Sequence, residues 1–569
     1  MALWHFGNTT VRSGLRLKDA LEVYSLSPFI GNIRGGEDRI HERNFHRLLG
    51  SQGIVTLSTG YGADETFSAG RKWRSALGKT GFIYEKYSRS SNFIQTDVGA
   101  VDKITPLGYR LLQAESVAGI QECYLRGLLA NFIEKDSGVI FSPLKFTLEV
   151  MTEIQNRTGD SKLHFMEMAM VLINSSPENI VSNVVDEILA FRARREAANN
   201  KRIFDASEKE RVPALFNVNR NTPSDYADTN FRYLSATGLF IRGRRSIKFN
   251  PAKQRLISLI ITNYQIPNTP LGRKLELTNG AILPTDQLEP AQQILDDIIS
   301  QAEERGIEIP EYSIGNTAAD INLVRFEIEE ELSKREEIRY ADDQVNQWEE
   351  IAGYMELLWS GRRNITIGED EISIRKEERP AYFEWVLWRA FLAINQLVNM
   401  PYEARRFKID QSFFPMGTAP GGGSDAIFIF QDYVIVGEVT LTTSTRQEAA
   451  EGEPVRRHVA KMVDQYIDKS VYGLFIANKI DSNTAETFRH GCWYRSDDSE
   501  LLLDIIPMTL KDFHSFFIEI FAYETDRTAL VRQLLDKCNM GREEYKAPAW
   551  KEYISTSIQD TILELRNSR

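Results

Sequence analysis

Apolar and polar residues alternate between residues 424 and 441 in a pattern that predicts a β-hairpin. Ala426 to Phe430 and Tyr433 to Leu441 are apolar and β-prone, and the Gln431-Asp432 pair between them is a polar turn. If the turn is centred on that pair, paired positions have residue numbers that sum to 863. Asp425 then lies opposite Glu438, and cross-strand partners sit about 5 Å apart on one face of a sheet. The pattern therefore predicts two neighbouring carboxylates.

The segments around this hairpin alternate between helical and strand patterns. Residues 381–399 are a strongly apolar helical stretch that ends before Pro401. Beyond the hairpin we expect helices at 459–468, 483–490, 509–535 and 548–566, and strands at 472–477 and 501–506. This order predicts a mixed β-sheet flanked by helices.

The N-terminal half predicts two units of short strands, turns and helices. In the first, about residues 1–125, Ile104 to Leu112 has the pattern of a strand, a Pro/Gly turn and a helix. In the second, about residues 140–265, a hairpin is expected between Phe231 and Pro251. A strand hairpin beside a helix is typical of winged-helix domains. Residues 201–228 are polar and predict a long loop.

Charged helical patterns occupy the middle of the chain, and Glu327 to Tyr340 (EIEEELSKREEIRY) is typical of a solvated helix face or a spacer. We therefore expect a multidomain α/β protein with three parts: a recognition region at 1–280, a helical linker at 281–365 and a catalytic domain at 366–569.

Charge is divided unevenly along the 569 residues, whose net charge is −12. Residues 1–280 contain 37 Lys and Arg against 28 Asp and Glu, a net +9, which leaves −21 for the remainder. A basic N-terminal half favours a polyanionic partner. The three cysteines lack metal or redox spacing, which is typical of a reducing cytoplasm. No secretory signal or membrane span is expected.

Basic residues in three segments of the N-terminal half are candidates for DNA contacts. Lys and Arg neutralise phosphates, and Arg can form two hydrogen bonds to a guanine edge. Each could equally be a solvated surface charge. The candidates are Arg34, Arg39 and Arg43 in the first segment, Arg71, Lys72, Arg74 and Lys79 in the second, and Arg242, Arg244 and Arg245 at the predicted hairpin tip.

The paired carboxylates predict a site for a hard divalent cation. Two such groups repel each other unless a positive charge lies between them, and Mg²⁺ takes oxygen ligands. Asp425 and Glu438 would be ligands, and the Val439 carbonyl could be a third. Alternatively, Asp425 is a turn residue and Glu438 a solvated strand charge.

The run APGGGSDAIFIFQDYVIVGEVT, preceded by FEWVLW and followed by GEPVRRH, resembles the AlwI-type type IIS restriction endonucleases and their strand-nicking relatives, which have a PD-(D/E)xK core. Here Ser424-Asp425 replaces Pro-Asp, and Thr440 replaces the usual Lys, whose role a second metal or a residue such as Lys461 would have to take. The resemblance implies a catalytic site of Glu384, Asp425, Glu438, Val439, Glu451 and His458. Taken alone, Glu384 could be a helix-dipole partner and His458 a cap or surface residue.

The resemblance also implies Mg²⁺ as cofactor, with Mn²⁺ or Ca²⁺ able to substitute in binding, and double-stranded DNA as substrate. It implies a bacterial, cytoplasmic restriction-modification enzyme that binds DNA as a monomer. Second-strand cleavage would need transient pairing of catalytic domains or a small partner subunit.

Three readings remain open beside a type IIS endonuclease that cuts at a fixed short distance from a short asymmetric sequence. The chain could be a nicking endonuclease of the same family. It could be a DNA-binding regulatory protein with an inactive nuclease-like domain, although that would be expected to lack a metal carboxylate. It could also be a metal-dependent hydrolase of another substrate, which the basic N-terminal half argues against.

Overall fold

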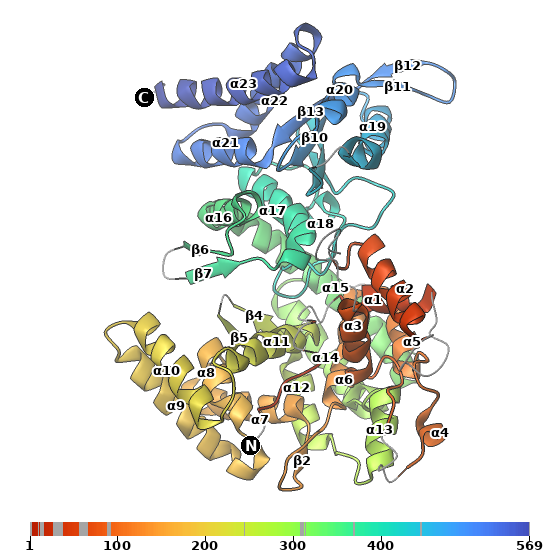
Figure 1. Cartoon of the computed structure of the whole chain (residues 1–569), viewed down its shortest axis with the longest axis vertical. Coiled ribbons are helices and arrows are strands. Elements are labelled where there is room, and N and C mark those ends of the chain that lie inside the picture. Colours follow the sequence, from red (N-terminus) through yellow and green to blue (C-terminus); the bar gives the residue numbers. More distant parts are fainter. Residues whose placement is uncertain are drawn as a thin grey trace. The chain divides into compact units, whose positions relative to one another are not determined.

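The computed structural model shown in Figure 1 describes residues 3–8, 11, 16–26, 38–55, 67–87, 93–243, 245–307, 312, 315–367, 370–443 and 446–567. Its contacts divide the chain into two compact units: residues 1–332 with Asp410–Ser412, and residues 333–409 with 413–569. The boundary falls inside the segment predicted as a linker. The three functional domains expected from the sequence stay a prediction.

The first unit is mostly helical. Its elements are α1 (Leu17–Leu26), α2 (Asp38–Ser51), α3 (Ser68–Lys79), α4 (Gln95–Val98), α5 (Pro106–Gln113), α6 (Val117–Leu129), β1 (Ile133–Glu134), β2 (Ile140–Phe141), α7 (Pro143–Thr158), β3 (Leu163–His164), α8 (Phe165–Met170), α9 (Val181–Glu196), α10 (Lys201–Leu215), α11 (Thr222–Ala236), β4 (Phe240–Arg242), β5 (Ser246–Phe249), α12 (Gln254–Asn263), α13 (Pro270–Asn279) and α14 (Leu288–Glu304). Helix α15 (Ala318–Asp343) spans the boundary between the units.

The hairpin predicted between Phe231 and Pro251 is present as β4 and β5, which pair antiparallel, and β3 adds to the other edge of β5. The long loop predicted at 201–228 is wrong, because helices α10 and α11 cover most of it. Two interactions that the polar composition does not reveal stabilise α10. Asn200 caps α10 by accepting from the Arg202 and Ile203 amides, and Asp205 pairs with Arg195 at 2.8 Å.

The second unit contains a four-stranded mixed sheet between helices. Its elements are α16 (Trp348–Ser360), β6 (Asn364–Ile367), β7 (Asp370–Ser373), α17 (Arg379–Ile394), α18 (Pro401–Ala404), β8 (Ala426–Ile429), β9 (Tyr433–Thr440), α19 (Arg446–Gln465), β10 (Ser470–Ala477), α20 (Ser482–His490), β11 (Cys492–Tyr494), β12 (Glu500–Leu502), β13 (Asp504–Thr509), α21 (Leu510–Ala522), α22 (Arg527–Glu544) and α23 (Ala547–Asn567). The sheet has the order β13-β10-β9-β8, in which only β8 is antiparallel to its neighbour. The expected mixed sheet flanked by helices is therefore confirmed.

The hairpin register is the predicted one. Ala426 pairs with Gly437 and Ile427 with Val436, so partner numbers sum to 863. Strand alternation places Glu438 and Thr440 on one face of β9, and Gly437 on the other. Leu387 and Phe428 pack where a side chain on Gly437 would lie, so α17 covers that face. Val459 packs against Gly473, so α19 covers the face that carries Glu438.

Three predicted boundaries in this unit are wrong. The helix expected from residue 459 begins at Arg446, because Gly452 and Pro454 do not interrupt α19, whose Gly452, Val455 and Val459 are buried. The strand expected at 501–506 is two strands in different sheets, β12 and β13. The helix expected at 509–535 is interrupted after α21, and α22 begins at Arg527.

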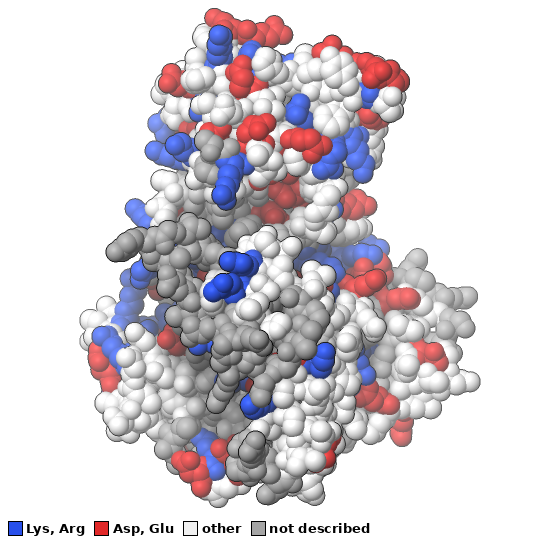
Figure 2. All heavy atoms as spheres, turned by 45° about the vertical axis from the view of Figure 1, so that its right-hand side comes forward, with Lys and Arg blue, Asp and Glu red and all other residues white. Residues whose placement is uncertain are grey.

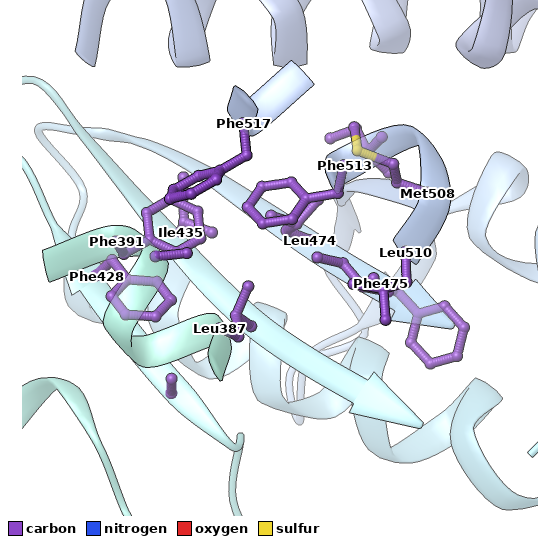
Figure 3. Packing of buried hydrophobic residues seen from close by; sticks show 14 of the residues in the cluster. Leu387, Phe391, Phe428, Ile435, Leu474, Phe475, Met508, Leu510, Phe513 and Phe517 are labelled. Atoms are coloured by element: carbon purple, nitrogen blue, oxygen red, sulfur yellow. The ribbon is translucent and has the colours of Figure 1, made fainter. Parts of the chain in front are cut away.

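Aromatic and aliphatic side chains fill the space between the sheet and α17 and α21, as Figure 3 shows. Phe391 of α17 stacks on Phe428 of β8 with ring centroids 4.1 Å apart, and Phe513 of α21 lies 6.1 Å from Phe391. Phe391, Phe428 and Ile435 are fully buried. This packing fixes α17 against the hairpin and so fixes the positions of the acidic residues that both carry.

We expect Phe391→Ala to lower the free energy of unfolding of the second unit by about 3–5 kcal/mol, because it leaves a cavity in this core. Leu563→Ala, on an exposed position of α23, should change it by less than about 0.5 kcal/mol. Chemical denaturation followed by tryptophan fluorescence measures this, since six of the eight tryptophans lie in this unit. Equal effects of the two substitutions would contradict the packing.

Candidate active site

Four acidic side chains and one histidine converge at the end of the hairpin, all within the second unit. Glu384 comes from the first turns of α17, Asp425 precedes β8, and Glu438 lies near the end of β9. Glu451 and His458 are seven residues apart in α19, which places them on one face of the helix that covers this side of the sheet.

The hairpin ties Asp425 to β9. The Val439 amide donates a hydrogen bond to Asp425 Oδ2 at 2.8 Å, which holds the carboxylate beside Glu438 as the register predicts. Glu438 is only 7% exposed, so it is not a solvated strand charge. Asp425 lies in a bend directly before β8, and its bond to the Val439 amide shows that its carboxylate contacts the neighbouring strand.

Helix α19 contributes the histidine. His458 Nδ1 lies 2.7 Å from Glu438 Oε1, so the ring and the carboxylate form a hydrogen bond. Burial, followed by the charges of Arg457 and Arg406, lowers the pKa of His458. Nε2 is buried and has no hydrogen-bond partner among the described residues. His458 is therefore neither a helix cap nor a surface residue, and its Nε2 can accept a proton.

Thr440 and Glu384 are positioned by hydrogen bonds of their own. The Thr440 hydroxyl accepts from the Thr442 amide at 3.2 Å, and its interaction with Glu451 opposes the rise that burial causes in the pKa of Glu451. Glu384 Oε2 accepts from the Ala419 amide at 2.6 Å, so this carboxylate interacts with the loop before β8 rather than acting only on its helix dipole. Glu384, Val439 and Thr440 also line a pocket of about 370 Å³, with Pro380, Phe383, Leu441 and Thr442.

Burial and mutual repulsion destabilise the ionised forms of Asp425, Glu438 and Glu384. Burial, followed by the charge of Glu438, raises the pKa of Asp425 to about 8. Burial, followed by the charge of Glu451, raises that of Glu438 to about 8. Burial and the charge of Asp425 raise the pKa of Glu384 well above its usual range. A site of this kind attracts protons or a cation.

Arg406 is the site residue that sequence reasoning missed. It lies between α18 and β8, and Nη1 donates to the Ser424 carbonyl at 3.1 Å. Its charge opposes the rises in the pKa of Glu384 and of Glu438. The available signal was the pair Arg405-Arg406 about twenty residues before Asp425.

The candidate DNA contacts of the first unit are placed in different settings. Arg43, Arg71 and Lys79 are exposed, whereas Lys72, Arg242 and Arg245 are half-buried. Arg74 pairs with the fully buried Asp102 side chain, a structural role. The guanidinium of Arg43 lies over the Phe67 ring at 4.9 Å, and that of Arg245 over the Phe165 ring at 5.7 Å.

Three of these candidates cannot be placed. Arg34 and Arg244 lie outside the described residues, as does the side chain of Arg39. On the face in Figure 2, basic and acidic side chains are interspersed, so charge alone does not identify a DNA surface there.

Comparison with known families decides the class of protein. The model of the AlwI restriction endonuclease family matches residues 78–516, more than three quarters of the chain. The chain belongs to this family. The resemblance found in the sequence is thus confirmed, and this AlwI-family protein is a restriction endonuclease, a nuclease that acts on DNA.

Two solved structures of restriction endonucleases are also similar to this AlwI-family protein. The small subunit R.BspD6I2 of the heterodimeric endonuclease R.BspD6I is 22% identical, with a TM-score of 0.28 over 37% of this chain and 98% of that chain. The restriction endonuclease FokI is 10% identical, with a TM-score of 0.21 over 91% of this chain and 97% of that chain. No curated protein matches this AlwI-family protein.

Among the described helices, none has the length and apolar character needed to cross a bilayer.

The raised pKa values of Asp425 and Glu438 predict a pH dependence of stability in EDTA. Both pKa values lie far above the ordinary values of 3.8 and 4.5, so their stabilising effect is complete below about pH 4 and is lost as pH rises through about 8. The melting temperature should therefore fall between pH 6 and 9.

Asp425→Asn should reduce the decrease of the melting temperature with rising pH, whereas Asp432→Asn, in the exposed hairpin turn, should not. Thermal denaturation across this pH range makes the comparison. Identical slopes for the wild type and Asp425→Asn would mean that the two buried carboxyls do not carry the effect.

Proposed function

We propose that this AlwI-family protein is a type IIS restriction endonuclease. It hydrolyses a DNA phosphodiester at a fixed short distance from a short asymmetric recognition sequence and depends on Mg²⁺. The observation that carries this proposal is the convergence of Asp425 and Glu438 across the β8–β9 hairpin, with Glu451 and His458 facing them from α19. The mixed sheet that holds them is the expected setting of a PD-(D/E)xK core.

The donor set fits a hard divalent cation. Asp425 and Glu438 offer carboxylate oxygens whose charge is poorly compensated, and the carbonyl of Val439, the residue after Glu438, is a third candidate ligand. No group of three or more His, Cys, Asp or Glu side chains suited to a metal occurs among the described residues, but this set needs only two carboxylates and a carbonyl. A bound Mg²⁺ would polarise the phosphoryl oxygen and lower the pKa of the attacking water.

The protein's own residues account for the remaining roles. His458 Nδ1 is hydrogen-bonded to Glu438, which fixes the orientation of the ring, and Nε2, which has no partner among the described residues, is the ring atom available for proton transfer. Glu451 faces the same carboxylates and can orient water or a second cation. Glu384, fixed by the Ala419 amide, acts as an accessory carboxylate on the other side of Asp425.

The first unit would recognise DNA. The antiparallel sheet β3-β5-β4 beside α8 and α11 supports a winged-helix-like subdomain, whose β4–β5 hairpin carries Arg242 and Arg245. Helices α2 and α3 pack against each other and present Arg43 and Arg71 to solvent. The proposed cleavage site lies in the other unit, so that recognition and cleavage would be carried out by separate parts of the chain.

Asp425→Asn and Glu438→Gln should each lower Mg²⁺-dependent plasmid cleavage by on the order of 10³-fold, because a metal supplies several kcal/mol of charge stabilisation. Asp464→Asn, on an exposed position of α19, should retain activity.

The plasmid products also distinguish a double-strand endonuclease from a nicking enzyme. Linear plasmid indicates double-strand cleavage, and a defined open circle indicates a nicking enzyme of the same family. Tight DNA binding without cleavage by the wild type would sink the catalytic roles and favour the regulatory alternative.

DNA contacts in the first unit can be tested by salt dependence. The double variant Arg71→Ala/Lys72→Ala should weaken binding to any duplex and reduce the slope of log K against log salt by about 2, as loss of two phosphate contacts would. Arg74→Ala should instead lower thermal stability, because it removes the ion pair with the buried carboxylate of Asp102. Fluorescence anisotropy in Ca²⁺ measures binding without cleavage. An unchanged slope in the double variant would place the DNA elsewhere.

A further inference from the structure

The active site has no lysine at the position where the wider nuclease superfamily has one. Thr440 occupies it, and its hydroxyl accepts from the Thr442 amide at 3.2 Å. Thr440 cannot carry charge, so a charged substitute must come from another element. Lys461, one candidate, is exposed on α19, whereas His458 in the preceding turn is nearly buried.

Arg406 belongs to the segment between α18 and β8, and an isolated β-bridge pairs this segment with β8. Arg405 and Ala426 form an isolated antiparallel bridge beside β8. In that register Arg406 lies opposite Asp425, and cross-strand partners point to the same face. The bridge therefore brings the segment that carries Arg406 beside the start of β8, where Asp425 lies.

Two contacts hold the Arg406 side chain in this place. Its Nη1 donates to the Ser424 carbonyl, next to Asp425. Gly423 leaves room for the guanidinium, because a Cβ there would sit 2.2 Å from Nη1. The preceding Arg405 points elsewhere and is bound by both oxygens of Glu337, at 2.6 and 2.7 Å. Arg405 therefore has a structural role, whereas the side chain of Arg406 lies at the candidate site.

Most of the donors of Arg406 remain available. A guanidinium has five N–H donors, and the bond to Ser424 uses one of them. Within the described part of the chain, Arg406 makes no other hydrogen bond, and its side chain is half-buried rather than solvated. Its charge also acts on Glu384, Glu438 and His458, which come from three different elements.

We propose that Arg406 supplies the positive charge missing at Thr440 by donating hydrogen bonds to a non-bridging oxygen of the phosphate that is cleaved. This role rests on the proposed function. A guanidinium suits it because its planar fork matches phosphate oxygens and it stays charged at any working pH. A donor placed where negative charge develops stabilises the transition state more than the ground state.

The test is single-turnover cleavage of a DNA fragment with the full-length chain in Mg²⁺. Arg406→Ala should lower the rate constant by about 10²-fold, the usual effect of removing one such donor, with DNA affinity in Ca²⁺ changed less than about 3-fold. Arg406→Lys should recover part of the rate, and added guanidinium should restore part of the activity of Arg406→Ala. Lys537→Ala, which removes a surface cation of α22, should cleave at the wild-type rate.

Other outcomes overturn the assignment in distinguishable ways. If Arg406 only holds the 423–424 backbone, guanidinium gives no rescue and thermal stability falls together with activity. If Arg406→Ala cleaves normally while Asp425→Asn does not, the proposed function stands and this role falls. A wild-type chain that fails to cleave DNA overturns both.

Discussion

Repulsion among buried carboxylates is the constraint on which the catalytic unit depends. Asp425, Glu438 and Glu384 are held within one shielded site, where burial and mutual charge raise the pKa of each. Such an arrangement costs stability and persists only because the surrounding structure enforces it. The hairpin register, the Val439 and Ala419 amides and the packing of α17 on β8 do this here. A bound cation would relieve the repulsion, which supports the proposed metal-dependent chemistry.

The sheet supplies rigidity, and the elements around it supply the chemistry. Its inner strands β9 and β10 are almost entirely buried, and helices cover both faces. The candidate site groups come from four segments: α17, the loop before β8, β9 and α19, which carries both Glu451 and His458. A substitution in the hydrophobic layer between α17 and the hairpin would therefore disturb Glu384 relative to Asp425 without touching either residue.

The sequence was informative where the chemistry is local and less so where it depends on tertiary packing. The hairpin register and the Asp425–Glu438 pair followed from strand alternation and one turn. Arg406 did not, because it reaches Asp425 only through a backbone bridge at Arg405 that no periodicity indicates. Helix α19 was placed too late because Gly452 and Pro454 favour a break that its buried face overrides. The polar residues of α10 hid a capped, ion-paired helix.

Direct cation binding tests the account most closely. Isothermal titration of the metal-free chain with Mg²⁺ near pH 7.5, in buffers of different ionisation enthalpy, reports both binding and proton release. Because the carboxyls of Asp425 and Glu438 are partly protonated there, binding should release protons, and Asp425→Asn should abolish it. Binding without proton release, or binding that is unchanged in Asp425→Asn, would contradict a metal site at the β8–β9 hairpin.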